Sequence, residues 1–67
     1  IAFRNMDERL EFYLKRYAEK AGKKNIEVSH QQIADDLNSS REVISRLLKK
    51  MEQRNLVKLH RNLIELL

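Results

Sequence analysis

The chain has 67 residues, which suffice for one domain and no more. It contains no cysteine, which excludes disulfide bridges and thiolate metal sites, and no apolar run of about 18 residues, so no membrane partner is expected. One glycine and no proline favour a mostly helical chain, and the 42% of hydrophobic residues suffice for a small core.

The positive charge is concentrated in one part of the sequence. Fourteen lysines and arginines against ten acidic residues give a net charge of +4. Residues 1–40 hold seven basic and seven acidic residues, residues 41–61 hold seven basic and two acidic ones, a net of +5, and Glu65 supplies the remaining −1. Such a cluster is typical of a surface that binds a polyanion, although a solvated basic helix would look the same.

The first helix is expected over Met6–Ala21, where apolar residues recur at the intervals of a helix face. Asn5 followed by Glu8 has the form of a capping box, and Gly22 can end the helix in a left-handed conformation. The aromatic residues of this helix follow the same spacing and are expected to pack rather than to stack on bases; they are Phe12, Tyr13 and Tyr17.

A short strand and a second helix are expected next. Residues 26–28 read apolar, polar, apolar, as a brief strand would. Ser29 opens a second capping-box pattern, and the helix that it starts runs to about Leu37. Asp35 and Asp36 are adjacent, so their side chains diverge around the helix; we expect them on the solvent side and not as a catalytic pair.

A tight corner separates the second helix from a third. Asn38 is expected to take the left-handed conformation that such a corner needs, where glycine is usual. Either Ser39 together with Glu42 in a capping box, or Ser40 alone, caps the third helix, which runs to about Gln53.

The sequence closes with a predicted β-hairpin. Asn55 can end the third helix in a left-handed conformation. Residues 56–60 and 63–67 alternate apolar and polar positions, and Arg61 and Asn62 form a two-residue turn between them.

The third predicted helix has two chemically different sides. With a rotation of about 100° per residue, one side gathers polar residues within about 60° of one another. These residues are Glu42, Ser45, Arg46 and Lys49. The opposite, apolar side contains Ile44, Leu47, Leu48 and Met51. The apolar side is therefore expected to pack on the other helices, which leaves the polar side exposed.

The polar side suits the reading of base edges. A helix about 10–12 Å in diameter fits the major groove of B-DNA, which is about 12 Å wide. Arginine can bond guanine O6 and N7, glutamate can accept from cytosine N4, and serine can bond a base or a phosphate. A glutamate beside an arginine, as in Glu42 and Arg46, would be out of place on a surface built only to attract phosphates.

Residues 30–37 (HQQIADDL) and 40–49 (SREVISRLLK) cover the second and third predicted helices. In these residues the sequence resembles the C-terminal DNA-binding domain of the Crp/Fnr family of bacterial transcription regulators. The most specific part of the resemblance is the pair Arg41-Glu42 followed by Ser45-Arg46. The resemblance extends over nearly the whole chain, including the closing hairpin.

The resemblance implies a mainly α fold with a small β-hairpin, a winged helix-turn-helix with a three-helix core plus a wing. Residues 1–67 would form one winged-helix DNA-binding domain, a fragment in which residues 1–5 are the end of a dimerisation helix and a hinge. The N-terminal sensor domain, whose effector the sequence does not identify, would be absent. The implied partners are double-stranded DNA, a second copy in a cytoplasmic, homodimeric regulator, and RNA polymerase as a possible further contact.

The family's pattern places the recognition helix at about residues 40–53 and implies specific site residues. The predicted contacts to bases are Arg41, which can also reach a phosphate, Glu42, Ser45 and Arg46. The predicted contacts to the DNA backbone are Ser29, His30, Gln31, Ser39, Ser40, Lys49, Lys50, His60 and Arg61. Of these, His30, Gln31, Ser40 and His60 match positions of the family that approach the backbone. No cofactor is expected in this domain.

Several simpler roles remain open for these residues. Glu42 and Arg46 are expected to form an i,i+4 ion pair in the absence of DNA, and Ser45 could bond back to the carbonyl of Arg41.

The alternative function is a winged-helix protein-interaction module that binds an acidic partner. An enzyme is not expected, because the sequence has no nucleophile-base constellation or glycine-rich phosphate loop, and two histidines without cysteine make a poor metal site.

Overall fold

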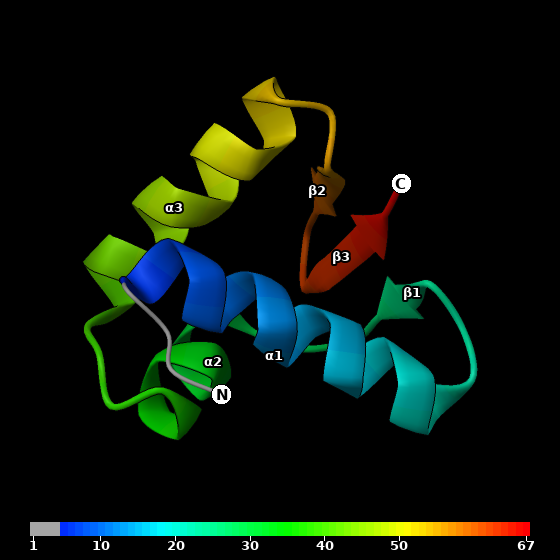
Figure 1. Ribbon diagram of the computed structural model, residues 1–67, viewed down its shortest axis with the longest axis horizontal. Coiled ribbons are helices and arrows are strands. Elements are labelled where there is room, and N and C mark those ends of the chain that lie inside the picture. Colours follow the sequence, from blue (N-terminus) through cyan, green and yellow to red (C-terminus); the bar gives the residue numbers. More distant parts are fainter. Residues whose placement is uncertain (1–4) are drawn as a thin grey trace.

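The computed structural model describes residues 5–67 and contains three helices and a three-stranded sheet (Figure 1). The elements are α1 (Met6–Ala21), β1 (Asn25–Ile26), α2 (His30–Asp36), α3 (Arg41–Gln53), β2 (Val57–His60) and β3 (Leu63–Leu66). This arrangement confirms the predicted winged helix-turn-helix; the β2–β3 hairpin is called the wing below. The prediction that residues 1–4 end a dimerisation helix lies outside the described residues.

Local capping fixes the ends of α1 as predicted. The side chain of Asn5 accepts a hydrogen bond from the backbone N–H of Glu8 at 3.0 Å, which satisfies a donor that the helix itself leaves unpaired. At the other end Gly22 adopts a φ of 69° and donates its N–H to the carbonyls of Ala18 and Glu19. The left-handed conformation costs glycine little, because it has no Cβ.

The corner between α2 and α3 is set by an asparagine and a serine. Asn38 has a φ of 55°, as predicted. The Ser40 hydroxyl accepts a hydrogen bond from the N–H of Val43 at 3.2 Å, so Ser40 is the residue that caps α3. Ser39 instead donates its N–H to the carbonyl of Ala34 at 2.8 Å and belongs to the corner.

Replacing Ser40 by alanine is therefore expected to lower the free energy of unfolding by about 1 kcal/mol, because the N–H of Val43 loses its acceptor. Urea denaturation followed by circular dichroism measures the change. Ser39→Ala is the matched control and should cost less, because the hydrogen bond of Ser39 uses its backbone. An equal loss in both variants would contradict the assignment of the cap.

Every helix and strand contributes to one apolar core. In the view of Figure 1, α1 crosses the molecule with α3 and the sheet on one side of it and α2 on the other. The buried hydrophobic residues that form this core are Leu10, Leu14, Ile26, Val28, Ile33, Ala34, Leu37, Ile44, Leu48, Val57 and Ile64. The predicted apolar side of α3 lies in this core: Ile44 and Leu48 are buried completely, and Leu47 and Met51 pack against them. Burial of this side fixes the direction in which the opposite side of α3 points.

The sheet has one strand more than the predicted hairpin. The strand expected at residues 26–28 lies at Asn25–Ile26 and pairs antiparallel with β3, so that the strand order is β1-β3-β2. Val28 is buried but leaves the sheet, because Ser29 must already cap α2. The predicted turn is confirmed, with Asn62 at a φ of 57°.

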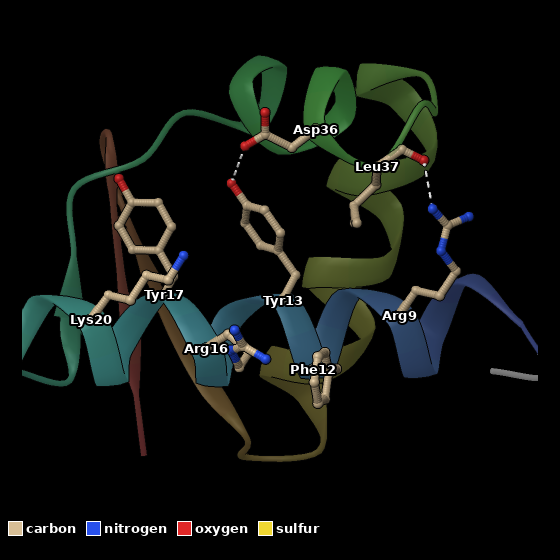
Figure 2. Close-up of a pocket in the computed structure, with 8 residues that line it drawn as sticks. All are labelled: Arg9, Phe12, Tyr13, Arg16, Tyr17, Lys20, Asp36 and Leu37. Carbon is tan, nitrogen blue, oxygen red and sulfur yellow. Dashed lines mark hydrogen bonds between the residues drawn. The ribbon is translucent and has the colours of Figure 1, made fainter. Parts of the chain in front are cut away.

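Two hydrogen bonds join α1 to α2 (Figure 2). The Tyr13 hydroxyl donates to a carboxylate oxygen of Asp36 at 2.5 Å, and the Arg9 guanidinium donates to the carbonyl of Leu37 at 3.1 Å. Burial, and then the bond to Asp36, raise the pKa of Tyr13 well above its ordinary value, so Tyr13 stays a neutral donor. Asp36 is exposed as predicted, but it also holds the two helices together.

The packing predicted for the aromatic residues of α1 is confirmed for two of the three. Tyr13 and Tyr17 are partly buried against the core. Phe12 is 36% exposed, and the Arg16 guanidinium lies 5.6 Å from the centre of its ring. The packing expected of Phe12 is not made against the core, because a helix carries its core residues on one side and Leu10 and Leu14 already occupy this side.

Candidate nucleic-acid interface

The polar side of α3 is exposed as predicted. Glu42, Arg46 and Lys49 are exposed, and Ser45 between them is partly buried. These four residues are called the outer strip. On the opposite side of the same helix Ile44 and Leu48 have no exposed surface. The core therefore holds the helix rigidly while the outer strip faces away from it.

The expected ion pair within the outer strip is absent. Glu42 and Arg46, both among the described residues, form no ion pair, so this prediction is wrong. An exposed pair of this kind contributes only about 0.3–0.5 kcal/mol and costs the freedom of two long side chains. Neither charged group is therefore committed to the other, and each is accessible to a ligand.

Ser45 is hydrogen-bonded to a residue of another helix. Its hydroxyl lies 2.8 Å from Nδ1 of His30, the first residue of α2. The back-bond to the carbonyl of Arg41 that the sequence left open is not formed. Because the contact joins residues fifteen positions apart, helical spacing gave no signal of it.

The surroundings of His30 favour the neutral form of its imidazole. Partial burial, and then the positive charge of Arg41, lower the pKa of His30 below its ordinary value. The same imidazole contacts Ser45 of the outer strip. His30 was predicted as a backbone contact, and the structure places it at the start of α2, in contact with Ser45 of the outer strip.

A hollow of about 460 Å³ opens between the start of α2, the start of α3 and the turn of the wing. Its lining is formed by Ser29, His30, Gln31, Arg41, His60, Arg61 and Asn62. Five of the nine predicted backbone contacts, which come from distant parts of the sequence, thus meet around one hollow. The two guanidinium groups give it a positive lining suited to an anion.

The other predicted backbone contacts lie outside this hollow. Lys49 and Lys50 are exposed further along α3, and Ser39 and Ser40 belong to the corner that precedes it. At the rim of the hollow His60 also interacts with Glu65 across the wing, at 3.1 Å. Lys49 and Lys50 thus extend the positive surface from the hollow along α3.

Glu52 fixes the wing to α3 and was missed by the sequence analysis. Its Oε2 accepts a hydrogen bond at 2.8 Å from the backbone N–H of Leu59, a residue of β2. A charge-assisted bond to a partly buried N–H sets the position of the wing relative to the helix. The sequence carried no signal for it, because the bond depends on how β2 folds back along α3.

Comparison with known proteins agrees with this geometry. The sequence matches the family model of the Crp-like helix-turn-helix domain over residues 8–67. The chain belongs to this family. A crystal structure of a candidate transcriptional regulator of the Crp/Fnr family from Eubacterium rectale is similar, with a TM-score of 0.94 and 34% sequence identity. The match covers 96% of this chain and 30% of that one. No curated protein matches the chain.

The Crp-like domain is thus a helix-turn-helix DNA-binding domain, of a family that regulates transcription and is not enzymatic. Its fold and the resemblance drawn from the sequence are both confirmed. Within residues 5–67 no helix is both long and apolar enough to cross a bilayer. The same residues contain no group of three or more side chains that would suit a metal ion.

Proposed function

We propose that this Crp-like domain binds duplex DNA sequence-specifically, with α3 in the major groove and the wing along the backbone. The observation that carries the proposal is the outer strip, which is polar and largely exposed and lies opposite an apolar side whose Ile44 and Leu48 are fully buried. The groove admits a helix of this diameter, and a rigid helix holds its side chains at fixed distances from base edges.

The residues of the outer strip offer a different chemistry to each kind of base edge. Arg46 presents a planar fork of donors that matches guanine O6 and N7, and Glu42 offers an acceptor to cytosine N4. Ser45 lies between them and can donate or accept. Arg41 is the first residue of α3, and in this proposal its guanidinium contacts a base or a phosphate.

The hollow and the lysines of α3 suit the phosphates on either side of the groove. Arg41 of α3 and Arg61 of the wing turn both line the hollow, and Lys49 and Lys50 lie further along α3. Ser29 and Ser40 lie where α2 and α3 begin, and the backbone N–H groups of a helix start favour an anion. These contacts would set the register of α3 without reading sequence.

The properties of a whole regulator are proposals for this chain, which spans 30% of the length of the solved relative. Two copies in a cytoplasmic dimer would place two α3 helices on half-sites about 34–36 Å apart, joined by a sensor domain that precedes this one. Contact with RNA polymerase would belong to that dimer. Binding of a single domain is expected to be weaker, since dimerisation links two half-sites.

The salt dependence of binding follows from the charge of residues 41–61. If the net +5 of this region neutralises about five phosphates, the logarithm of the affinity should fall against the logarithm of the salt concentration with a slope of about −4.5. Fluorescence anisotropy with a labelled duplex at several salt concentrations measures it. Lys49→Ala should reduce the slope by about 1 and weaken binding to all sequences alike. A slope near zero would contradict binding to DNA through this surface.

Selection from a random-sequence duplex pool tests the proposed function directly. The domain should enrich a short motif, in which guanine is expected where Arg46 reads. A module that binds an acidic protein would bind the duplexes through charge alone and enrich nothing. Lack of enrichment at low salt would therefore favour that alternative.

A further inference from the structure

The hydrogen bond between His30 and Ser45 connects α2 to the middle of the outer strip. The 2.8 Å between Nδ1 and the hydroxyl oxygen shows that one of the two groups donates and the other accepts. A serine hydroxyl has one proton and two lone pairs, so its bond to His30 decides what it can still offer to a ligand. Both residues are partly buried, which holds this contact in place.

We propose that His30 is a positioning residue for specificity: through its hydrogen bond to Ser45 it sets whether this hydroxyl presents a donor or an acceptor to a base edge. The base preferred at the position that the Ser45 hydroxyl contacts then changes when His30 gains a proton. This inference rests on the proposed function and adds a determinant to the same surface.

The two protonation states of His30 act on Ser45 in different ways. In the neutral imidazole Nδ1 can accept the hydroxyl proton, which leaves Ser45 with lone pairs alone and so favours a base that donates, cytosine through N4 or adenine through N6. In the imidazolium Nδ1 carries a proton and can only donate. Ser45 then keeps its own proton for a base that accepts, guanine at O6 or thymine at O4.

The groups with a permanent charge that line the hollow with His30 are both cationic: Arg41 at the start of α3 and Arg61 in the turn of the wing. The titratable His60 lines the same hollow. Among the described residues, no carboxylate lines this hollow. These charges favour the neutral imidazole before DNA binds, whereas phosphates would favour the imidazolium. Protonation of any histidine near the DNA should therefore raise the overall affinity on acidification. Only a change in the base preferred at the position that Ser45 contacts is specific to the hydrogen bond between His30 and Ser45.

The inference is tested by selecting duplexes from a random pool with the 67-residue chain at about pH 5.5 and at about pH 8, on either side of the ordinary histidine pKa. One position of the motif is expected to change, from cytosine or adenine at high pH towards guanine or thymine at low pH. The ratio of affinities for two duplexes that differ only there should move by about three- to tenfold, the size of one hydrogen bond. The positions read by Arg46 and Glu42 should stay unchanged.

Three variants separate this effect from other titrations. His30→Asn keeps a polar group near Nδ1 that does not titrate, and Ser45→Ala removes the hydroxyl; both should abolish the change with pH. His60→Gln removes the other histidine of the hollow and should keep it. A change that survives in His30→Asn, or that vanishes in His60→Gln, would overturn the inference.

A spectroscopic readout makes the result independent of how well a variant binds. Long-range ¹H–¹⁵N spectra distinguish a protonated from an unprotonated Nδ1, and the unprotonated form is expected for His30 at about pH 8. A protonated Nδ1 at that pH would overturn the inference. A motif that ignores pH would overturn it too and leave the proposed function standing, whereas no motif at either pH would overturn both.

Discussion

Leu48→Ala is expected to lower the free energy of unfolding by about 2–5 kcal/mol. Leu48 has no exposed surface, and with Ile44 it is one of the two fully buried residues through which α3 packs into the core. A chain of this length has a total stability of only about 3–10 kcal/mol, so one cavity removes a large part of it. Urea denaturation followed by circular dichroism measures the loss, and the variant should be partly unfolded at 37 °C.

The matched control for this substitution is Leu67→Ala. The same atoms are removed, but Leu67 is 62% exposed and packs on little, so its loss should stay within about 0.5 kcal/mol. If Leu48→Ala lowered the free energy of unfolding as little as Leu67→Ala does, burial of the apolar side would not be what anchors α3. DNA binding by Leu48→Ala should fall in proportion to the unfolded fraction, on specific and scrambled sites alike, because the outer strip itself is intact.

The features predicted correctly from the sequence are those that neighbouring residues decide. Asn5 and Ser29 cap helices through N–H groups three residues away, and Asn38 and Asn62 take the left-handed conformation that their tight turns need. The two sides of α3 follow from helical spacing alone. Because the apolar side must be buried, the exposure of the outer strip could be predicted as well.

The features that were missed depend on contacts between distant segments. Ile26 pairs with Ile64, which turns the predicted hairpin into a three-stranded sheet with β3 in the centre. The same holds for the bond from Ser45 to His30, which no local pattern could reveal. A polar side chain can find partners on several elements, and the choice is made only when the helices pack.

The predicted ion pair between Glu42 and Arg46 is absent for a different reason. Glu42 and Arg46 have the right spacing, but spacing shows only that two side chains can meet. In water the attraction between exposed charges barely offsets the loss of side-chain freedom. The consequence for the candidate site is favourable, since neither charge has to leave a partner before it meets a base.

Arg46→Ala is expected to remove the discrimination between DNA sites. Binding to the duplex selected from the random pool should weaken by about 1–3 kcal/mol, whereas binding to a scrambled duplex should change far less. The reason is that Arg46 is exposed in the centre of the outer strip, where its fork of donors can meet guanine O6 and N7 together. Fluorescence anisotropy with both duplexes at one salt concentration measures the two affinities.

Two further variants separate base reading from charge. Arg46→Lys keeps the positive charge but loses the planar fork, so it should keep the affinity for the scrambled duplex and still lose discrimination. Arg16→Ala removes the same charge from α1, where the guanidinium lies over Phe12, and should preserve discrimination. Equal losses on the selected and scrambled duplexes in Arg46→Ala would refute base reading by this residue and leave it only an electrostatic role. Discrimination that survives in Arg46→Lys would show that the planar fork of Arg46 is not what reads the base. Charge could not explain such discrimination, because the charge of the phosphates is the same for every sequence.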